Sequence, residues 1–243
     1  MNAIEEKELQ KGHQRILYDG SLGDIDPARW PDLFEPAFLE NNGLTGSTAA
    51  GRGQVYFFSH GPLKLVLRHY RRGGLLGKVI SDSYLGLSAG GSRPFREWRL
   101  LRKLYELDLP VPRPAAARIT RGPGFYRGDL LTHELENASA FSTLLQKEPL
   151  EEDAWRGVGR TIRLFHDQGV SHSDLNAANI LLRDREVFLL DFDKGSIRAD
   201  GAWKRAQLER LQRSLEKWQR QAGTFHFSQP GWEALLAGYQ AGS

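Results

Sequence analysis

The sequence predicts an α+β fold of two lobes, with an antiparallel β-sheet in the first lobe and mainly helices in the second. Between residues 55 and 135, short apolar runs alternate with turns that contain glycine or proline, which is typical of strands. After residue 150, apolar side chains recur at helical spacing. The 243 residues, 40% of them hydrophobic, suffice for two small lobes, which we place at 1–135 and 136–243.

Composition excludes several kinds of site. The chain has no cysteine, so disulfides, thiolate zinc sites and cysteine nucleophiles are excluded. The first residues lack the basic start and apolar run of a signal peptide, and we expect none. No segment approaches about 18 consecutive apolar residues, so we expect no membrane-spanning helix. The net charge of +3 favours no partner by itself.

A glycine-rich segment stands near the start of the first lobe. Residues 1–40 mix short polar runs with few apolar positions and predict a leading arm packed on this lobe. Residues 43–53 are rich in glycine and small side chains, and 55–70 predicts two strands joined by a turn. Glycines let backbone N–H groups approach phosphate oxygens, so Gly51 and Gly53 are candidate phosphate-binding residues. These glycines do not form the G-x-G-x-x-G pattern, and a surface loop remains the alternative.

One cation and one carboxylate stand out in the next elements. Lys64 and Arg68 share a face of the second strand. Arginine can bind phosphate through two hydrogen bonds, which favours Arg68, whereas Lys64 lies beside the turn and is expected to be solvated. Apolar spacing predicts a helix over 93–105, and this helix carries Glu97. Glu97 forms either an ordinary surface ion pair or, as we favour, the carboxylate that orients the cation of the strand.

The second lobe begins after a short connection. Residues 134–138 predict the hinge between the lobes. A buried helix face covers 155–165, and Gly169 ends that helix. The last long helix is predicted over about 203–221 and is strongly basic on its outer side. Such a run of charge is either a solvated face or a site for an anionic acceptor or a membrane surface.

The most informative stretch is residues 172–182 (HSDLNAANILL), followed by 191–193 (DFD). The apolar residues after Asn179 predict a strand, a polar turn and a return strand, so the hairpin brings Asp191 back beside Asn179. Oxygen ligands of this kind suit Mg²⁺. An isolated H-x-D is common, but the full pattern resembles the catalytic and metal-binding loops of protein-kinase-like phosphotransferases, in which phosphoryl transfer requires mainly positioning and charge neutralisation.

Further stretches narrow this resemblance. The chain resembles the 3-deoxy-D-manno-octulosonic acid (Kdo) kinases of lipopolysaccharide assembly, and the similarity spans both lobes. The stretches that carry it are 67–74 (LRHYRRGG), 109–114 (LPVPRP), 172–182 together with 191–193, and 210–217 (RLQRSLEK). The first and last of these are more specific than the catalytic loop, which many kinases share.

The resemblance implies ATP-dependent phosphorylation of a Kdo hydroxyl on a lipid A precursor at the cytoplasmic face of the inner membrane. It implies Asp174 as the catalytic carboxylate that accepts the hydroxyl proton, and Asn179 and Asp191 as ligands of Mg²⁺. The chain departs from the broader kinase pattern in having Arg68 in place of lysine. It also has Asn176 in place of lysine, which argues against a protein substrate, and Asp193 in place of glycine.

Two other functions remain as alternatives. The chain could phosphorylate a soluble small molecule such as an aminoglycoside or choline, or it could be a non-catalytic nucleotide-binding regulator. The intact catalytic stretch argues against a regulator. Basic residues favour the lipid-linked acceptor, which is polyanionic, and we expect peripheral binding to an anionic membrane surface and no nucleic-acid partner. The basic residues expected to serve this role are Arg71, Arg72, Arg210, Arg213 and Lys217.

Overall fold

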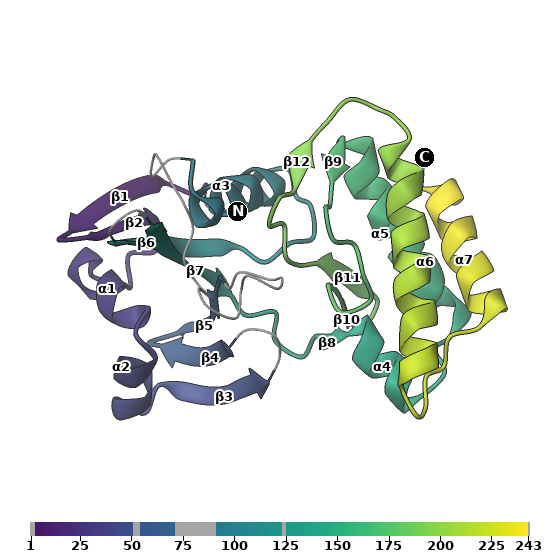
Figure 1. Cartoon of the computed structure of the whole chain (residues 1–243), viewed down its shortest axis with the longest axis horizontal. Coiled ribbons are helices and arrows are strands. Elements are labelled where there is room, and N and C mark those ends of the chain that lie inside the picture. The colour runs from purple at the N-terminus through teal and green to yellow at the C-terminus, as the bar shows by residue number, and fades with distance from the viewer. Residues whose placement is uncertain (1–2, 51–53, 71–90, 123–124, 243) are drawn as a thin grey trace. The chain divides into compact units, whose positions relative to one another are not determined.

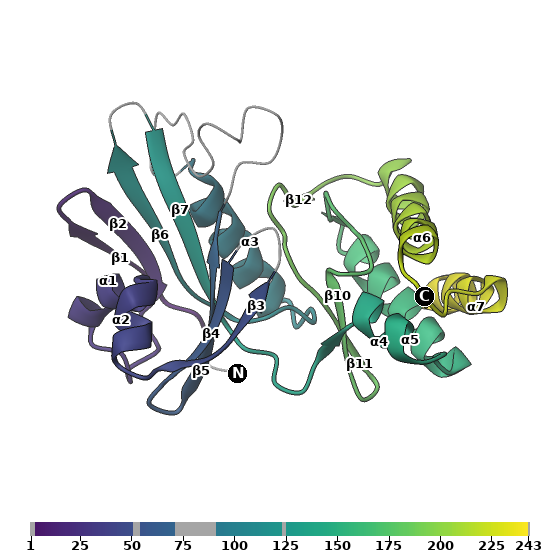
Figure 2. The ribbon, with the colours of Figure 1, turned by 60° about the horizontal axis from the view of Figure 1, so that its bottom comes forward.

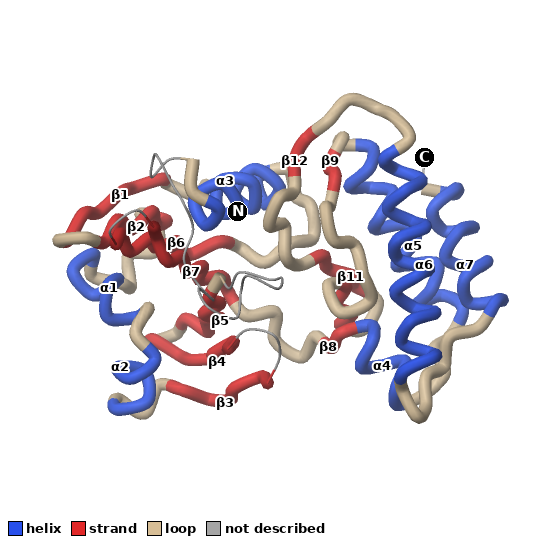
Figure 3. The backbone as a smooth tube through the Cα atoms, viewed as in Figure 1, coloured by secondary structure: helices blue, strands red, loops and turns tan. Residues whose placement is uncertain are grey.

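The chain forms two compact units. The computed structural model describes residues 3–50, 54–70, 91–122 and 125–242. The first unit comprises Met1–Glu106 and Pro112–Glu134, and the second comprises Leu107–Val111 and Leu135–Ser243. Strands dominate the first unit and helices dominate the second (Figure 3), which confirms the predicted α+β class.

A twisted antiparallel sheet forms the first unit (Figures 1 and 2). Its spatial order is β1-β2-β6-β7-β5-β4-β3, and every neighbouring pair is antiparallel. The strands are β1 (Glu6–Lys11), β2 (Gln14–Asp19), β3 (Thr45–Ala50), β4 (Gln54–His60), β5 (Leu63–His69), β6 (Pro114–Gly122) and β7 (Phe125–His133).

Helices cover both faces of this sheet. A 3₁₀ turn (Pro27–Arg29), α1 (Trp30–Leu33) and α2 (Pro36–Asn41) lie on one face. There Trp30 and Phe34 are buried against Leu65 and Leu67 of β5. The other face carries α3 (Arg93–Glu106), which buries Trp98 and other apolar side chains. Successive side chains of a strand point to opposite faces of the sheet. Because Leu67 faces α1 and α2, its neighbour Arg68 points toward the face that carries α3.

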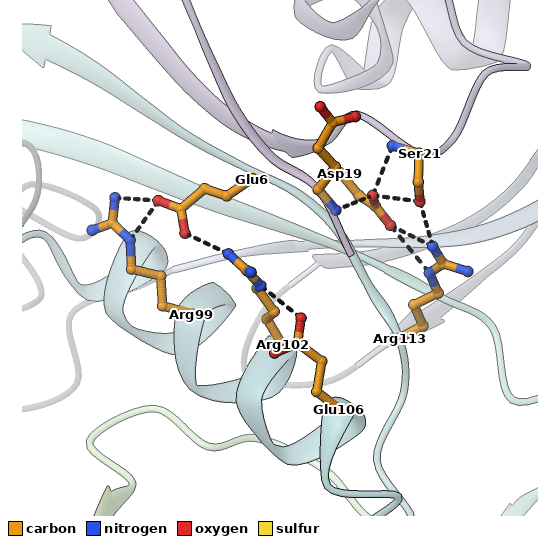
Figure 4. A network of polar contacts seen from close by, with 8 residues as sticks. Glu6, Asp19, Ser21, Arg99, Arg102, Glu106 and Arg113 are labelled. Carbon is orange, nitrogen blue, oxygen red and sulfur yellow. Dashed lines mark hydrogen bonds and ion pairs between the residues drawn. The ribbon is translucent and has the colours of Figure 1, made fainter. Parts of the chain in front are cut away.

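The prediction of a leading arm is wrong, because residues 6–41 form the β1–β2 hairpin, a 3₁₀ turn and the short helices α1 and α2. The sequence of β1, EKELQK, shows no clear apolar alternation, since this edge strand is largely exposed. Polar contacts, instead of buried apolar side chains, join this strand to α3 (Figure 4). Glu6 of β1 accepts hydrogen bonds from Arg99 at 2.8 Å and Arg102 at 3.1 Å, both on α3. These ion pairs join residues more than ninety positions apart.

A buried carboxylate anchors the end of β2 (Figure 4). Asp19 is fully buried. One of its oxygens accepts from the N–H groups of Glu5 and Ser21 and from the Ser21 hydroxyl. The other oxygen accepts from Arg113 at 2.6 Å. The charge of Asp19 is therefore both paired and hydrogen-bonded, as a buried carboxylate requires.

The second unit combines four helices with two small sheets. No helix in the described ranges is long and apolar enough to cross a membrane. The elements are β8 (Ser139–Ala140), α4 (Phe141–Lys147), α5 (Glu152–Asp167), β9 (Val170–Ser171), β10 (Ile180–Arg183), β11 (Glu186–Leu189), β12 (Ser196–Ile197), α6 (Trp203–Gln221) and α7 (Gln229–Ala241). The bounds of α6 agree with the predicted basic helix, but a further helix, α7, follows it.

The unpredicted helix α7 packs closely against α5, and α6 runs alongside (Figure 1). A Cβ atom at Gly159 of α5 would lie 1.9 Å from the carbonyl oxygen of Leu235 on α7, and one at Gly238 would lie 2.2 Å from that of Arg156. Glycine is required at both positions by this close approach. On α7 such a glycine weakens the helix signal of the sequence, and α7 was not predicted.

Candidate active site

The predicted hairpin is confirmed in the second unit. Strands β10 and β11 pair antiparallel with Ile180 opposite Leu189. The N–H of Leu190 then donates to the carbonyl of Asn179 at 2.9 Å. Asp191 follows directly, in the left-handed region with φ of 64°. The hairpin thus places the two predicted oxygen ligands at its open end, because Asn179 directly precedes β10 and Asp191 comes just after the end of β11.

Asn176 organises the loop that carries Asp174. Its side-chain oxygen accepts from the N–H groups of Ala178 at 2.9 Å and Asn179 at 3.2 Å. Its amide nitrogen donates to the Asp174 carbonyl at 3.0 Å and to the Asp174 carboxylate at 3.2 Å. Sequence reasoning treated Asn176 only as a missing lysine. Asparagine commonly makes such local turns, so this signal was available in the sequence.

The amide of Asn179 has a defined orientation. Its nitrogen donates to the carbonyl of Asp174 at 3.0 Å. Because this bond uses the nitrogen end of the amide, the oxygen end is the one that can ligate a cation. The same bond closes the loop from residue 174 to residue 179.

Buried His172 connects this loop to the segment that carries Asp191. Its Nε2 donates to the Leu190 carbonyl at 2.7 Å, and its Nδ1 accepts from the N–H of Asp174 at 3.2 Å. Burial lowers the pKa of His172 below its usual value, which favours the neutral ring that this pair of bonds requires. Its ring also packs 4.7 Å from that of Phe192, centre to centre. His172 therefore has a structural role, because it holds the loop that carries Asp174 against the segment that carries Asp191.

Helix α6 supports the catalytic loop along one face. Gln207, Arg210 and Ser214 lie at positions i, i+3 and i+7, which share a helix face. The Gln207 side-chain oxygen accepts from the N–H of His172 at 3.2 Å. The Ser214 hydroxyl accepts from the N–H of Ala177 at 3.3 Å. These contacts join residues 35 and 37 positions apart, and nothing in the local sequence pattern predicts them.

The carboxylate of Asp174 is accessible to solvent. Its side chain is 57% exposed, and one of its oxygens lies 3.2 Å from Nη1 of Arg210, whose side chain is 51% exposed. Asp174 is therefore held by the loop through its backbone while its carboxylate remains open to an incoming group. Of the basic residues that the sequence offered for an anionic acceptor, the structure places Arg210 in contact with the predicted catalytic residue.

The first unit brings together Arg68 and Glu97. The guanidinium of Arg68 on β5 donates to the Glu97 carboxylate on α3 at 2.5 Å. The Tyr70 hydroxyl donates to the same carboxylate oxygen, and the Arg68 guanidinium lies 4.8 Å from the centre of the Tyr70 ring. The side chain of Glu97 is 2% exposed and that of Arg68 is 26% exposed. A buried carboxylate thus fixes a cation that still reaches solvent.

The other predicted phosphate-binding residues lie outside the described residues. These are Gly51 and Gly53, and the same holds for the basic residues Arg71 and Arg72. The glycine-rich segment is partly a strand, because 45–50 forms β3 and pairs with β4. Ala50 and Gln54, the residues on either side of the undescribed positions, are opposite each other in this pair.

Known proteins resemble this chain over nearly its whole length. A kinase from Photobacterium profundum, named 3-deoxy-D-manno-octulosonic acid kinase, is 41% identical over 235 residues and covers 96% of this chain and 98% of its own length. One of the same name from Actinobacillus succinogenes is 39% identical over 241 residues, with 96% and 99% coverage. The chain is thus similar to these kinases over nearly its whole length.

A solved structure and a family model extend the comparison. The structure described as WaaP in complex with acyl carrier protein matches with a TM-score of 0.53 at 17% identity, covering 88% of this chain and 86% of that one. This likeness supports the predicted protein-kinase-like fold. Residues 38–239 match the model of the lipopolysaccharide kinase (Kdo/WaaP) family. With relatives at about 40% identity over nearly the full length, the chain belongs to the lipopolysaccharide kinase (Kdo/WaaP) family.

Proposed function

We propose that this chain transfers the terminal phosphoryl group of ATP to a hydroxyl of Kdo on a lipid A precursor. The observation that carries the proposal is the loop that displays Asp174 beside Asn179 and Asp191, in a chain whose near-full-length relatives are named Kdo kinases. Those names favour this reaction over the alternatives of a soluble acceptor and a non-catalytic regulator.

Asp174 is the proposed general base. Its exposed carboxylate accepts the proton of the acceptor hydroxyl as the hydroxyl oxygen forms a bond to the terminal phosphorus. The bond from that phosphorus to the bridging oxygen breaks, and ADP leaves with the electron pair. The N–H of Asp174 is held by His172, and its carbonyl is held by both Asn176 and Asn179. Positioning of this kind contributes strongly to phosphoryl transfer.

Asn179 and Asp191 are the proposed Mg²⁺ ligands. No cluster of three His, Cys, Asp or Glu side chains suited to a metal occurs within the described ranges. A pair of amide and carboxylate oxygens nevertheless fits Mg²⁺, which takes its remaining ligands from phosphate and water. When bound, the ion neutralises charge on the phosphates of ATP. The protein contributes the fixed amide orientation of Asn179 and the turn at Asp191.

Arg68 is the proposed phosphate-binding cation, and Glu97 and Tyr70 position it. A guanidinium offers five N–H donors in a planar fork. Part of this fork contacts Glu97 and Tyr70, and the side chain of Arg68 is 26% exposed, so the phosphate oxygens of a nucleotide can approach it. Gly51 and Gly53 remain candidates for backbone contacts with the same phosphates.

The acceptor also leads us to propose peripheral binding at an anionic membrane surface. Arg213 and Lys217 are exposed on α6, and with Arg210 they form a basic edge on this helix. Basic residues near an anionic bilayer contribute on the order of 1 kcal/mol each. Arg71 and Arg72 are proposed to add to this attraction.

The test of the proposed reaction is phosphate transfer with purified chain, ATP, Mg²⁺ and a Kdo-bearing lipid A precursor, read by mass spectrometry. We expect one added phosphate on the Kdo unit. Choline and kanamycin serve as soluble comparison acceptors, and we expect no transfer to either. Transfer to a soluble acceptor with none to the lipid would refute the proposed substrate.

A further inference from the structure

Arg210 occupies an unexpected position for a basic residue on a solvated helix face. Within the described part of the chain it makes one ion pair, and its partner is the catalytic candidate Asp174, at 3.2 Å. Both side chains are about half exposed, and an ion pair this exposed contributes little to stability. Stability therefore does not explain why a cation lies beside the proposed base.

Support of the catalytic loop does not explain Arg210 either. Gln207 and Ser214 hold the loop through its backbone from the same face of α6. Asn176 and Asn179 close the loop from within. Arg210 lies between the two supporting residues of α6, so its backbone is held next to Asp174. Its contact is with the reactive carboxylate and not with the backbone.

The chemistry of the acceptor offers a role for this guanidinium. Kdo is a sugar acid, so the sugar whose hydroxyl must approach Asp174 also carries a carboxylate. The contact with Asp174 engages one nitrogen of Arg210. A guanidinium has further donors, arranged to match the two oxygens of a planar carboxylate. The hydroxyl of such a sugar can then contact Asp174 while its carboxylate contacts the neighbouring Arg210.

We propose that Arg210 binds the carboxylate of the sugar-acid acceptor and thereby directs the acceptor hydroxyl to Asp174. The inference rests on the proposed function and identifies the part of the acceptor that the site recognises. Before the acceptor binds, Arg210 is paired with Asp174. The incoming carboxylate takes over donors of Arg210 and leaves the Asp174 carboxylate facing the hydroxyl. A neutral sugar lacks this group and is positioned poorly.

The experiment compares two acceptors and three variants. The acceptors are the Kdo-bearing lipid A precursor and the same molecule with the Kdo carboxyl converted to a carboxamide. Arg210→Ala removes the proposed contact, and Arg210→Lys keeps the charge but loses the planar fork. Arg205→Ala is the matched control, because Arg205 is also on α6 and its exposed ion pair with Glu209 is comparable. KM and kcat are measured for each acceptor, and KM for ATP is measured in parallel.

We expect the wild-type chain to show a KM about 10- to 100-fold higher for the carboxamide than for the acid, the range for one lost charged hydrogen-bonding contact. Arg210→Ala should raise KM for the acid by a similar factor and should not distinguish the two acceptors. Such non-additivity identifies a direct contact. Arg210→Lys should fall between, while Arg205→Ala should match the wild type, and KM for ATP should be unchanged throughout.

Three results would overturn the inference. Wild-type chain that uses acid and carboxamide equally well would show that the carboxylate is not recognised, whatever the variants do. An equal loss on both acceptors in Arg210→Ala would assign Arg210 to positioning of Asp174. A loss in Arg205→Ala as large as that in Arg210→Ala would indicate a general charge effect. Wild-type chain that phosphorylates neither acceptor would instead refute the proposed function, and the inference with it.

Discussion

At the scale of single residues, the proposed site relies on two carboxylates in opposite environments. Glu97 is buried and accepts from both Arg68 and Tyr70, so its role is to hold a cation in place. Asp174 is exposed and is held through its backbone, so its carboxylate can exchange a proton with an acceptor. The burial of each group matches the role that we propose for it.

The choice of Arg68 as the phosphate-binding cation can be tested on one strand. Arg68→Ala should raise KM for ATP and lower kcat, together reducing kcat/KM by at least about 100-fold, because it removes a charged, bidentate contact with the phosphates. Lys64→Ala, four residues earlier on β5, should change kcat/KM less than about threefold. Steady-state kinetics with varied ATP measures both. The opposite ranking would show that Lys64 is the phosphate-binding residue.

At the scale of elements, α6 links the catalytic loop to the rest of the second unit. Gln207 accepts from the N–H of His172 and from the ring of His166 on α5, and donates to Ser171. His166 in turn accepts from the Tyr239 hydroxyl on α7. Three helices thus meet in a buried polar network behind the loop. Networks of this kind are stable only when every member is satisfied.

This network makes the stability of the chain depend on pH. Burial lowers the pKa of His166 from 6.5 to about 4, so the unfolded chain binds the proton more readily than the folded chain. The contribution to stability is fully present above about pH 6.5 and is lost as the pH falls toward 4. The loss for His166 alone is on the order of 3 kcal/mol, because each pKa unit of difference between the folded and unfolded chain corresponds to about 1.4 kcal/mol.

His166→Asn removes this titrating group. Wild-type chain should show a urea midpoint that falls between pH 7 and pH 4.5, and the variant should show a smaller fall. His133 and His172, whose pKa values are also lowered by burial, remain in both proteins and serve as the internal reference. An equal fall in the two proteins would contradict the assignment of this titration to His166.

Sequence patterns predicted elements well where an apolar period was present. The β10–β11 hairpin and the bounds of α6 were predicted, because apolar side chains mark their buried faces. The β1–β2 hairpin was missed because edge strand β1 is exposed and charged. Helix α7 was missed, and its close packing on α5 requires Gly238, which weakens a helix signal.

The site was predictable to a similar extent and for a related reason. Asp174 and Asn179 lie in the loop that leads into β10, and Asp191 lies just past β11, so short-range pattern and spacing were enough to associate them. Contacts made across long separations in the chain were not predictable. Gln207 and Arg210 on α6 contact residues of the loop that lie 35 and 36 positions away in the sequence. The apolar period of a helix predicts its buried face, but it does not predict which distant residues that helix will contact.

At the scale of the whole molecule, membrane binding should depend on salt. We propose that the chain approaches its lipid-linked acceptor through basic surface residues, and such an attraction to an anionic bilayer is electrostatic. Flotation with anionic vesicles should recover most of the chain at low salt. Recovery should fall as ionic strength rises past about 0.1 M, where the Debye length drops below about 10 Å.

Neutral phosphatidylcholine vesicles are the control for this flotation, and they should recover little chain at any salt concentration. Arg213→Ala with Lys217→Ala should weaken binding to anionic vesicles by about 10-fold or more, since two basic residues are lost. Binding that is insensitive to both salt and these substitutions would show that the basic edge of α6 is only a solvated surface.

The central claim is that the chain phosphorylates a lipid-linked sugar acid with Asp174 as the base. Phosphate transfer from ATP to the Kdo-bearing lipid A precursor, measured with wild-type chain and Asp174→Asn side by side, tests it most directly. We predict transfer by the wild type and a loss in kcat of about 100- to 10,000-fold in the variant, the range for a general base, with nucleotide binding by calorimetry retained. Near-normal transfer by Asp174→Asn would contradict the account.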